Sequence, residues 1–112
     1  MRAPKLNRKF TLEAVSAAPD GSGGFVETWA SLGTVWAELK GSSGRDQDID
    51  EAALSRANFR ITLRAAPAGA SERPLPGQRF REGSRIFPIL AVVDHDPDGR
   101  WLSCVVREEA VR

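Results

Sequence analysis

The chain of 112 residues has no tyrosine, one cysteine, one histidine and a net charge of only +1. A single cysteine, Cys104, cannot form an intramolecular disulfide, and its place in an apolar run indicates a small core residue rather than a nucleophile. A net charge near zero argues against a protein that neutralises nucleic-acid phosphates over a broad face. Aromatic residues make up only 7%, so stacking platforms for single-stranded nucleic acid are poorly supplied.

The sequence also contains few residues that could form a metal or catalytic site. His95 has no second histidine or cysteine at ligand spacing, which argues against a zinc site. Residues 94–99 resemble the start of a calcium loop, but Val105 stands where the bidentate glutamate belongs, so we interpret them as an acidic β-turn. Ser103, His95 and Asp94 lack the elbow and oxyanion hole of a catalytic triad. We therefore expect no enzyme activity, no cofactor and no metal.

Long hydrophobic runs are absent too. No stretch approaches the roughly 18 apolar residues that cross a bilayer, so we expect no membrane partner. Residues 1–5 are basic without an apolar signal region, which predicts that the protein stays in the cytoplasm where it is made. The length fits one domain over residues 1–112, with residues 1–8 as a flexible basic arm. The 41% of hydrophobic residues suffices for one modest core.

A glycine-rich turn organises the first third of the chain. Residues 19–24 combine Pro-Asp-Gly with Ser-Gly-Gly and so supply the preset φ and the positive φ angles of a tight reversal. The flanking residues 9–17 and 25–30 alternate weakly, which predicts a hairpin. Residues 31–33 are expected to break the extension before the next strand.

The rest of the chain contains further extended segments and two long loops. Residues 34–40, 54–65, 78–81, 85–93 and 100–107 read as strands around loops 41–53 and 65–77. The apolar run 85–93 predicts a central strand covered on both sides, and Pro88 predicts a bulge, a bend or an unpaired edge. The residues expected to point inward are Val35, Ala37, Leu39, Phe59, Ile61, Leu63, Leu102, Cys104 and Val106. The sum is an all-β protein, a small antiparallel SH3-like barrel of about six strands.

Two features are candidates for contacts with other molecules. Trp36 points outward, either to cover the barrel mouth or to anchor a subunit contact. Charges are also segregated along the chain. The basic candidates are Arg2, Lys5 and Arg8 in the arm and Arg79, Arg81 and Arg85 near the second loop, whereas the first loop is acidic. The acidic loop of one copy could meet the basic surface of the next, or these could simply be solvated faces.

Several motifs together resemble one protein family. They are KLNRKFTLE (residues 5–13), PDGSGGFVETW (19–29), TVWAEL (34–39), FRITLR (59–64), RIFPILAV (85–92) and RWLSC (100–104). In this order they are similar to the head–tail joining proteins of long-tailed phages, also called head-completion or stopper proteins. They are particularly similar to those of bacterial gene transfer agents.

The resemblance implies a structural protein assembled in the bacterial cytoplasm and located in the neck of the particle. Copies of the chain would form a ring between the portal-side adaptor protein and the tail terminator protein, closing the channel for double-stranded DNA and docking the tail. The family's channel loop corresponds to residues 41–53. The channel-loop candidates are Gly44, Arg45, Asp46, Asp48, Ile49, Asp50 and Glu51. Their acidic character suits a gate or a slippery lining better than a DNA grip.

The alternative hypothesis is a free-standing SH3-like or OB-like barrel that binds nucleic acid or peptide. Strong salt-dependent DNA binding by a monomer would favour it.

Overall fold

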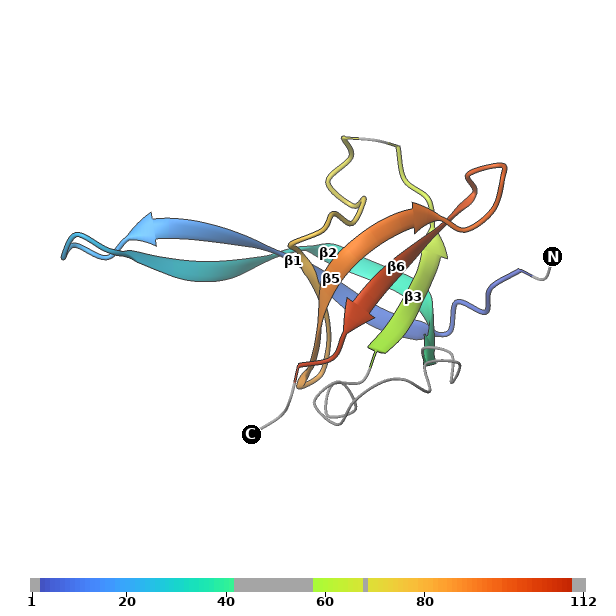
Figure 1. Cartoon of the computed structure of the whole chain (residues 1–112), viewed down its shortest axis with the longest axis horizontal. Helices are drawn as coiled ribbons and strands as arrows, with labels where there is room; N and C mark the ends of the chain where they lie inside the picture. Colours follow the sequence, from blue (N-terminus) through green and yellow to red (C-terminus); the bar gives the residue numbers. More distant parts are fainter. Residues whose placement is uncertain (1–2, 42–57, 68, 110–112) are drawn as a thin grey trace, which may run out of the picture.

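The computed structural model describes residues 3–41, 58–67 and 69–109. Its strands are β1 (Arg8–Pro19), β2 (Phe25–Gly41), β3 (Asn58–Arg64), β4 (Arg79–Glu82), β5 (Arg85–Asp94) and β6 (Trp101–Arg107). They pair antiparallel in the order β1-β2-β3-β6-β5-β4, and β4 returns to β1, which closes the barrel (Figure 1). The prediction of a six-stranded all-β barrel is confirmed. In the described part of the chain, no helix is long and apolar enough to cross a membrane.

The barrel interior is filled by aromatic and branched side chains. The ring of Phe10 lies edge-on to Phe80 and to Phe87, with centroids 5.8 Å apart in both pairs. Such edge-to-face pairs add to the free energy gained by burying the rings. The residues predicted to point inward are buried or pack against this core. Those buried are Ala37, Ile61, Leu63, Leu102, Cys104 and Val106, and those partly buried against them are Val35, Leu39 and Phe59.

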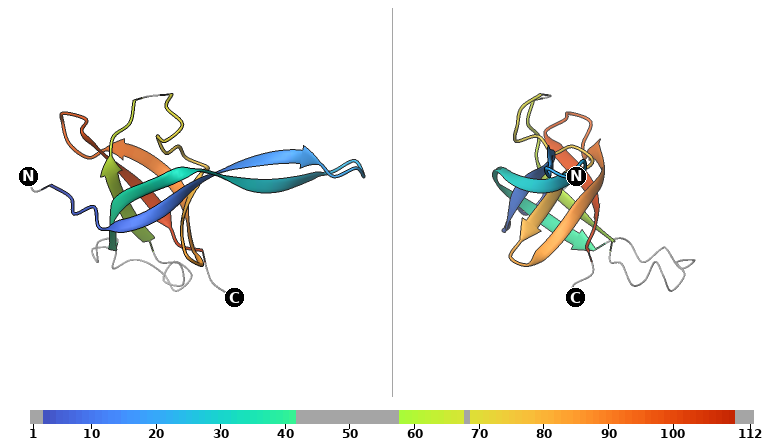
Figure 2. Two further views of the ribbon diagram at one scale, coloured as in Figure 1. Left: turned by 180° about the vertical axis from the view of Figure 1, so that it is seen from behind. Right: turned by 90° about the vertical axis from the view of Figure 1, so that its left-hand side faces the viewer.

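Strands β1 and β2 extend far beyond the barrel. They pair along their whole length, from Arg8↔Ala37 to Pro19↔Phe25. β4 pairs with β1 only at residues 11–13, and β3 pairs with β2 only at residues 37–41. Residues 14–30, which we call the ribbon, therefore project from the barrel as a two-stranded sheet (Figures 1 and 2).

The turn at the tip of the ribbon is the one that the sequence predicts. Gly21 and Gly23 both have positive φ, at 85° and 88°. The Asp20 carboxylate accepts hydrogen bonds from the backbone N–H groups of Ser22 and Gly24, at 2.8 and 3.1 Å, and these bonds lower the pKa of Asp20. Asp20 thereby fixes the reversal with local bonds alone.

The predicted break at residues 31–33 is wrong, because β2 is one continuous strand of 17 residues. A β-bulge stands there instead. Leu12 pairs with Gly33 and Glu13 pairs with Ser31, so Leu32 is the extra residue, and Gly33 takes a φ of 135°. A bulge bends and twists a strand without ending it. This bulge lies where the barrel passes into the ribbon.

Strand β5 differs from its prediction in two ways. It is not covered on both sides, because Phe87 and Ile89 are buried while Leu90 and Val93 are exposed. A small barrel has a single interior, and the outer face of β5 is left largely in contact with solvent. Pro88 stays paired with Arg79, and the register irregularity falls just beyond it, between Ile89 and Ala91.

Two further predictions concern the connections. The acidic turn before β6 is confirmed, since the buried Asp96 carboxylate accepts hydrogen bonds from the backbone N–H groups of Arg100 and Trp101. The segment between β3 and β4 contains no strand in its described part, as predicted. The first long loop, including the channel-loop candidates at residues 44–51, lies outside the described residues.

Candidate interaction surfaces

The structure places the predicted contact residues in different settings. Trp36 is 55% exposed on the outer face of β2, across from Lys9 on β1, as predicted. The backbone N–H of Lys5 donates to the Glu38 carboxylate at 3.0 Å. Arg2 lies outside the described residues. The four remaining arginines bind carboxylates of this same chain.

Arg8 and Arg85 form one ionic network with two carboxylates. Arg8 donates two hydrogen bonds to Glu82, at 2.6 and 2.8 Å, and Arg85 donates two to Glu108, at 2.8 and 3.0 Å. Arg85 also lies 3.8 Å from Glu82. The hydrogen bonds from the guanidinium groups lower the pKa of Glu82 and of Glu108, although burial opposes the shift. Bidentate pairs of this kind fix the geometry of both side chains.

Arg79 and Arg81 share the carboxylate of Glu13. Arg79 Nε lies 2.7 Å from Glu13 Oε1, and Arg81 Nε lies 3.2 Å from Glu13 Oε2 without hydrogen-bond alignment. The side chains of Arg79 and Glu13 are both only 11% exposed. Arg79 therefore serves the junction between barrel and ribbon and is not a free surface cation.

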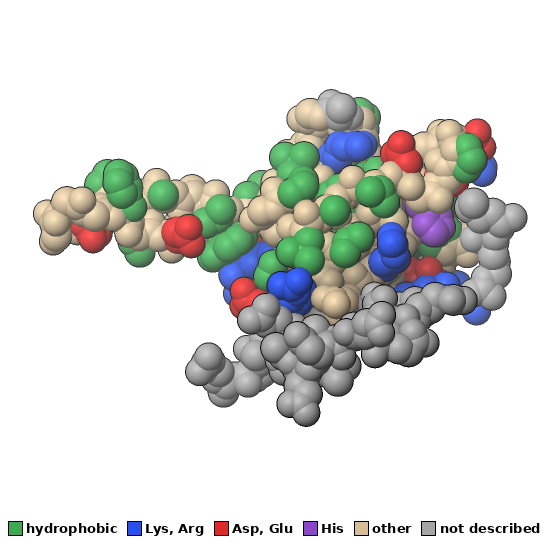
Figure 3. Space-filling view, in the orientation of Figure 1, with side chains coloured by type: hydrophobic (Ala, Val, Ile, Leu, Met, Phe, Trp, Pro, Cys, Tyr) green, Lys and Arg blue, Asp and Glu red, His purple; other side chains and the backbone are tan. Residues whose placement is uncertain are grey.

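The ribbon is the largest surface feature that the sequence did not predict. Cross-strand partners share a face, so its two faces follow from the register. One face carries Val15, Ala17, Pro19, Phe25, Glu27 and Trp29, and the other carries Ala14, Ser16, Ala18, Val26, Thr28 and Ala30. Phe25 is 72% exposed, and Val15 and Val26 are exposed as well. Figure 3 shows hydrophobic side chains along the projecting part of the molecule.

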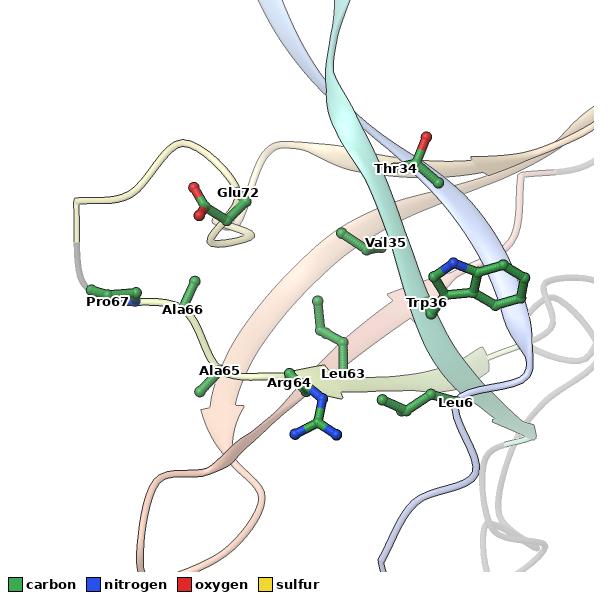
Figure 4. A pocket seen from close by; sticks show the side chains of 10 residues that line it. All are labelled: Leu6, Thr34, Val35, Trp36, Leu63, Arg64, Ala65, Ala66, Pro67 and Glu72. Atoms are coloured by element: carbon green, nitrogen blue, oxygen red, sulfur yellow. The ribbon is translucent and has the colours of Figure 1, made fainter.

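A cleft of about 430 Å³ opens beside β2 on the barrel. β2 and β3 stop pairing at Ala37↔Leu63, and the cleft lies between β2 and the segment that follows β3 (Figure 4). Val35 on β2 faces Leu63 at the end of β3, and both line its apolar part together with Ala65 (Figure 4). The further lining residues are Leu6, Thr34, Trp36, Arg64, Ala66, Pro67 and Glu72. The cleft is thus mainly apolar, with one cation and one carboxylate.

The residues that were considered as catalytic or metal-binding candidates are part of the core or of a turn. Cys104 is fully buried, and burial raises the pKa of its thiol to about 12, against a smaller opposing effect of the Arg73 charge. Both oxygens of Asp96 are occupied by Arg100 and Trp101. Among the described residues, no three histidine, cysteine or acidic side chains are grouped to hold a metal ion.

Comparisons with known proteins identify similar structures and a matching protein family. A chain from the virion of a native gene transfer agent particle is 46% identical, with a TM-score of 0.78 over 98% of this chain and all of that one. The solution structure of protein SF1141 from Shigella flexneri 2a is 20% identical over the full length of both chains, with a TM-score of 0.71, and shows the same fold. No curated protein matches significantly. The model of the phage head completion protein family matches residues 1–109. Since that match spans almost the whole sequence, the chain belongs to the phage head completion protein family.

Proposed function

We propose that the protein is a structural stopper in the neck of a phage-like particle. Copies form a ring between the portal–adaptor complex and the tail, close the DNA channel and provide the surface on which the tail docks. The observation that carries this proposal is the full-length similarity to a chain of a gene transfer agent virion, at 46% identity. Assembly would take place in the bacterial cytoplasm, and the partners are further copies, the adaptor, the tail terminator and double-stranded DNA.

The surface of the chain supports a role in assembly. A two-stranded ribbon is at best marginally stable in water by itself, and this one exposes Phe25, Val15 and Val26. Exposed apolar surface of this kind marks sites of protein contact. The internal ion pairs of Arg8, Arg79, Arg81 and Arg85 leave these cations less able to bind DNA phosphates.

Residues 44–51 are the proposed channel segment. They hold Asp46, Asp48, Asp50 and Glu51 against the single cation Arg45, a net charge of −3. Carboxylates that face the channel would repel DNA phosphates, so the segment would block or release DNA without adhering to it.

Electron cryomicroscopy of the particles that carry this protein tests the proposal. We expect a ring of this chain between the portal complex and the tail. Deleting its gene should give DNA-leaking heads without tails. Particles with intact necks and normal tails in the absence of the chain would contradict the proposal, and salt-sensitive DNA binding by the isolated monomer would then favour the free-standing barrel.

A second experiment isolates the channel segment. Deleting residues 44–51 should leave the urea unfolding midpoint unchanged, because it removes none of the described core residues, while DNA retention falls. A matched variant replaces the four carboxylates by Asn and Gln at constant length. If DNA leaks only from particles with the deletion, the size of the segment closes the channel. If DNA leaks from particles with either variant, the negative charge of the segment is required. Normal retention in both would remove the channel assignment.

A further inference from the structure

We propose that the ribbon of one copy docks in the cleft beside Trp36 of the next copy, with Phe25 as the side chain that enters it. This inference rests on the proposed ring and names the contact that would build it. The occupant of the cleft is thus a second copy of this chain.

The ribbon lacks the partners that a sheet normally has. In the described structure, residues 14–19 and 25–30 pair only with each other, and both of their outer edges are open. The side chains of residues 15–19, 25–28 and 30 are exposed, whereas Trp29 is half-buried under Arg79. Phe25, beside the tip, is 72% exposed, and an aromatic side chain left in water gains free energy when a partner buries it.

The cleft has the size and the lining to receive such a side chain. Its volume of about 430 Å³ falls in the range of pockets that hold small organic molecules. Val35 and Leu63 supply apolar contact inside, and Trp36 also lines the cleft, with its exposed indole on the other side of β2 from Val35 (Figure 4). Aromatic anchors seated in apolar pockets carry much of the energy of protein interfaces.

The charges of the two surfaces are complementary. The ribbon contains Asp20 and Glu27 and no lysine or arginine, so its net charge is −2. The charges of Arg64 and Glu72 in the cleft lining cancel, and the adjoining outer face around Trp36 carries Lys5, Lys9 and Lys40 against Glu38, a net charge of +2. Opposite potentials on facing patches steer association and fix its register.

The placement of the two surfaces makes the contact intermolecular. The ribbon points away from the barrel on one side, and the N-terminal segment that contributes Leu6 to the cleft leaves on the opposite side (Figures 1 and 2). A ribbon therefore does not reach its own cleft. Two different and complementary surfaces of one chain, the ribbon and the cleft, give a head-to-tail contact, which repeats around a ring when the rotation closes.

Crosslinking in assembled particles tests the contact. The variant with Ser22→Cys and Pro67→Cys places one thiol at the tip of the ribbon and one at the cleft, both at exposed positions, and it keeps Phe25. Cys104 is buried and unreactive, so it can stay. A short bis-maleimide should give a ladder of dimers, trimers and higher multimers. The matched control, Ser22→Cys with Ser84→Cys on the exposed β4–β5 turn, should not give that ladder.

Removing the anchor sharpens the test. Adding Phe25→Ala to the Ser22/Pro67 cysteine pair should lower the yield of multimers about tenfold, as expected when an interface aromatic is lost. Equal yields with and without Phe25, or a crosslink from position 22 to a different neck protein, would overturn the docking proposal. A neck ring that is visible in particles but yields no ladder also overturns it and leaves the proposed function intact. Particles whose necks lack the chain overturn both.

Discussion

The guanidinium of Arg79 lies over the indole of Trp29, with its Cζ 3.9 Å from the ring centroid. Arg79 belongs to β4 in the barrel, and Trp29 belongs to the ribbon half of β2. The same arginine binds Glu13 at 2.7 Å. This contact ties the base of the projecting ribbon to the barrel, so the direction in which the ribbon points depends on it.

Replacing Arg79 by alanine should destabilise the protein by about 1–3 kcal/mol, because it removes a cation–π contact and leaves the nearly buried Glu13 with a poorly aligned partner. Urea unfolding measures the effect. Arg64→Ala is the matched control, since Arg64 lies over Trp101 at 5.0 Å but is exposed. It should cost less than about 1 kcal/mol. Equal costs would show that Arg79 has no special role at the junction.

Two phenylalanines separate folding from assembly. Phe87→Ala should cost about 3–5 kcal/mol, because Phe87 is fully buried and packs edge-on against Phe10 and Phe59. Phe25→Ala should leave the free energy of unfolding within about 0.5 kcal/mol of that of the unchanged chain, because Phe25 is mostly exposed. The count of tailed particles should instead fall with Phe25→Ala. A large loss of stability in Phe25→Ala would mean that the ribbon folds onto its own barrel.

Stability should fall in acid through the network of Arg8, Glu82, Arg85 and Glu108. The pKa values of Glu82 and Glu108 are lowered from 4.5 in the folded state. A carboxyl group whose pKa is lowered by folding stabilises the folded state when the pH is above the ordinary pKa of that group. This contribution disappears as the pH falls through the folded-state pKa. Urea midpoints should therefore be level near neutral pH and drop below about pH 4.5. Glu82→Gln should flatten that drop, and an unchanged slope would assign the acid sensitivity elsewhere.

The buried thiol provides a probe of unfolding. Because burial raises the pKa of Cys104 to about 12, almost no thiolate forms near neutral pH. A thiol reagent should modify Cys104 only slowly in the native protein, because the reaction has to wait for transient opening of the fold. Labelling should be faster in urea. Rapid labelling without denaturant would mean that β6 opens readily from the barrel.

The sequence predicted the barrel because its core positions alternate cleanly. Ile61 and Leu63 in β3, and Leu102 and Cys104 in β6, point inward as the period of two requires. It did not predict the bulge, because Ser31-Leu32-Gly33 has the composition of a break as well as that of a bulge. Only pairing with β1 decides between them.

The interaction surfaces were less predictable for a related reason. Glu13 lies 66 residues before Arg79, and Arg8 lies 74 residues before Glu82, so no local pattern reveals that these charges neutralise one another. The ribbon also alternates as a barrel strand does. Nothing in the spacing of Val15 or Phe25 shows that their strands leave the barrel and stay uncovered.

The bulge at Leu32 marks the point beyond which the ribbon can change in length without a change in the barrel. Beyond the Glu13–Ser31 pair, neither strand pairs with β3 or β4, so the register of the barrel does not depend on the length of the ribbon. Adding or deleting two residues in each ribbon strand would lengthen or shorten the projection by about 7 Å and keep every side chain on its face. In the proposed ring, a change in the ribbon alone would alter the spacing between neighbouring copies, with the barrel left as it is.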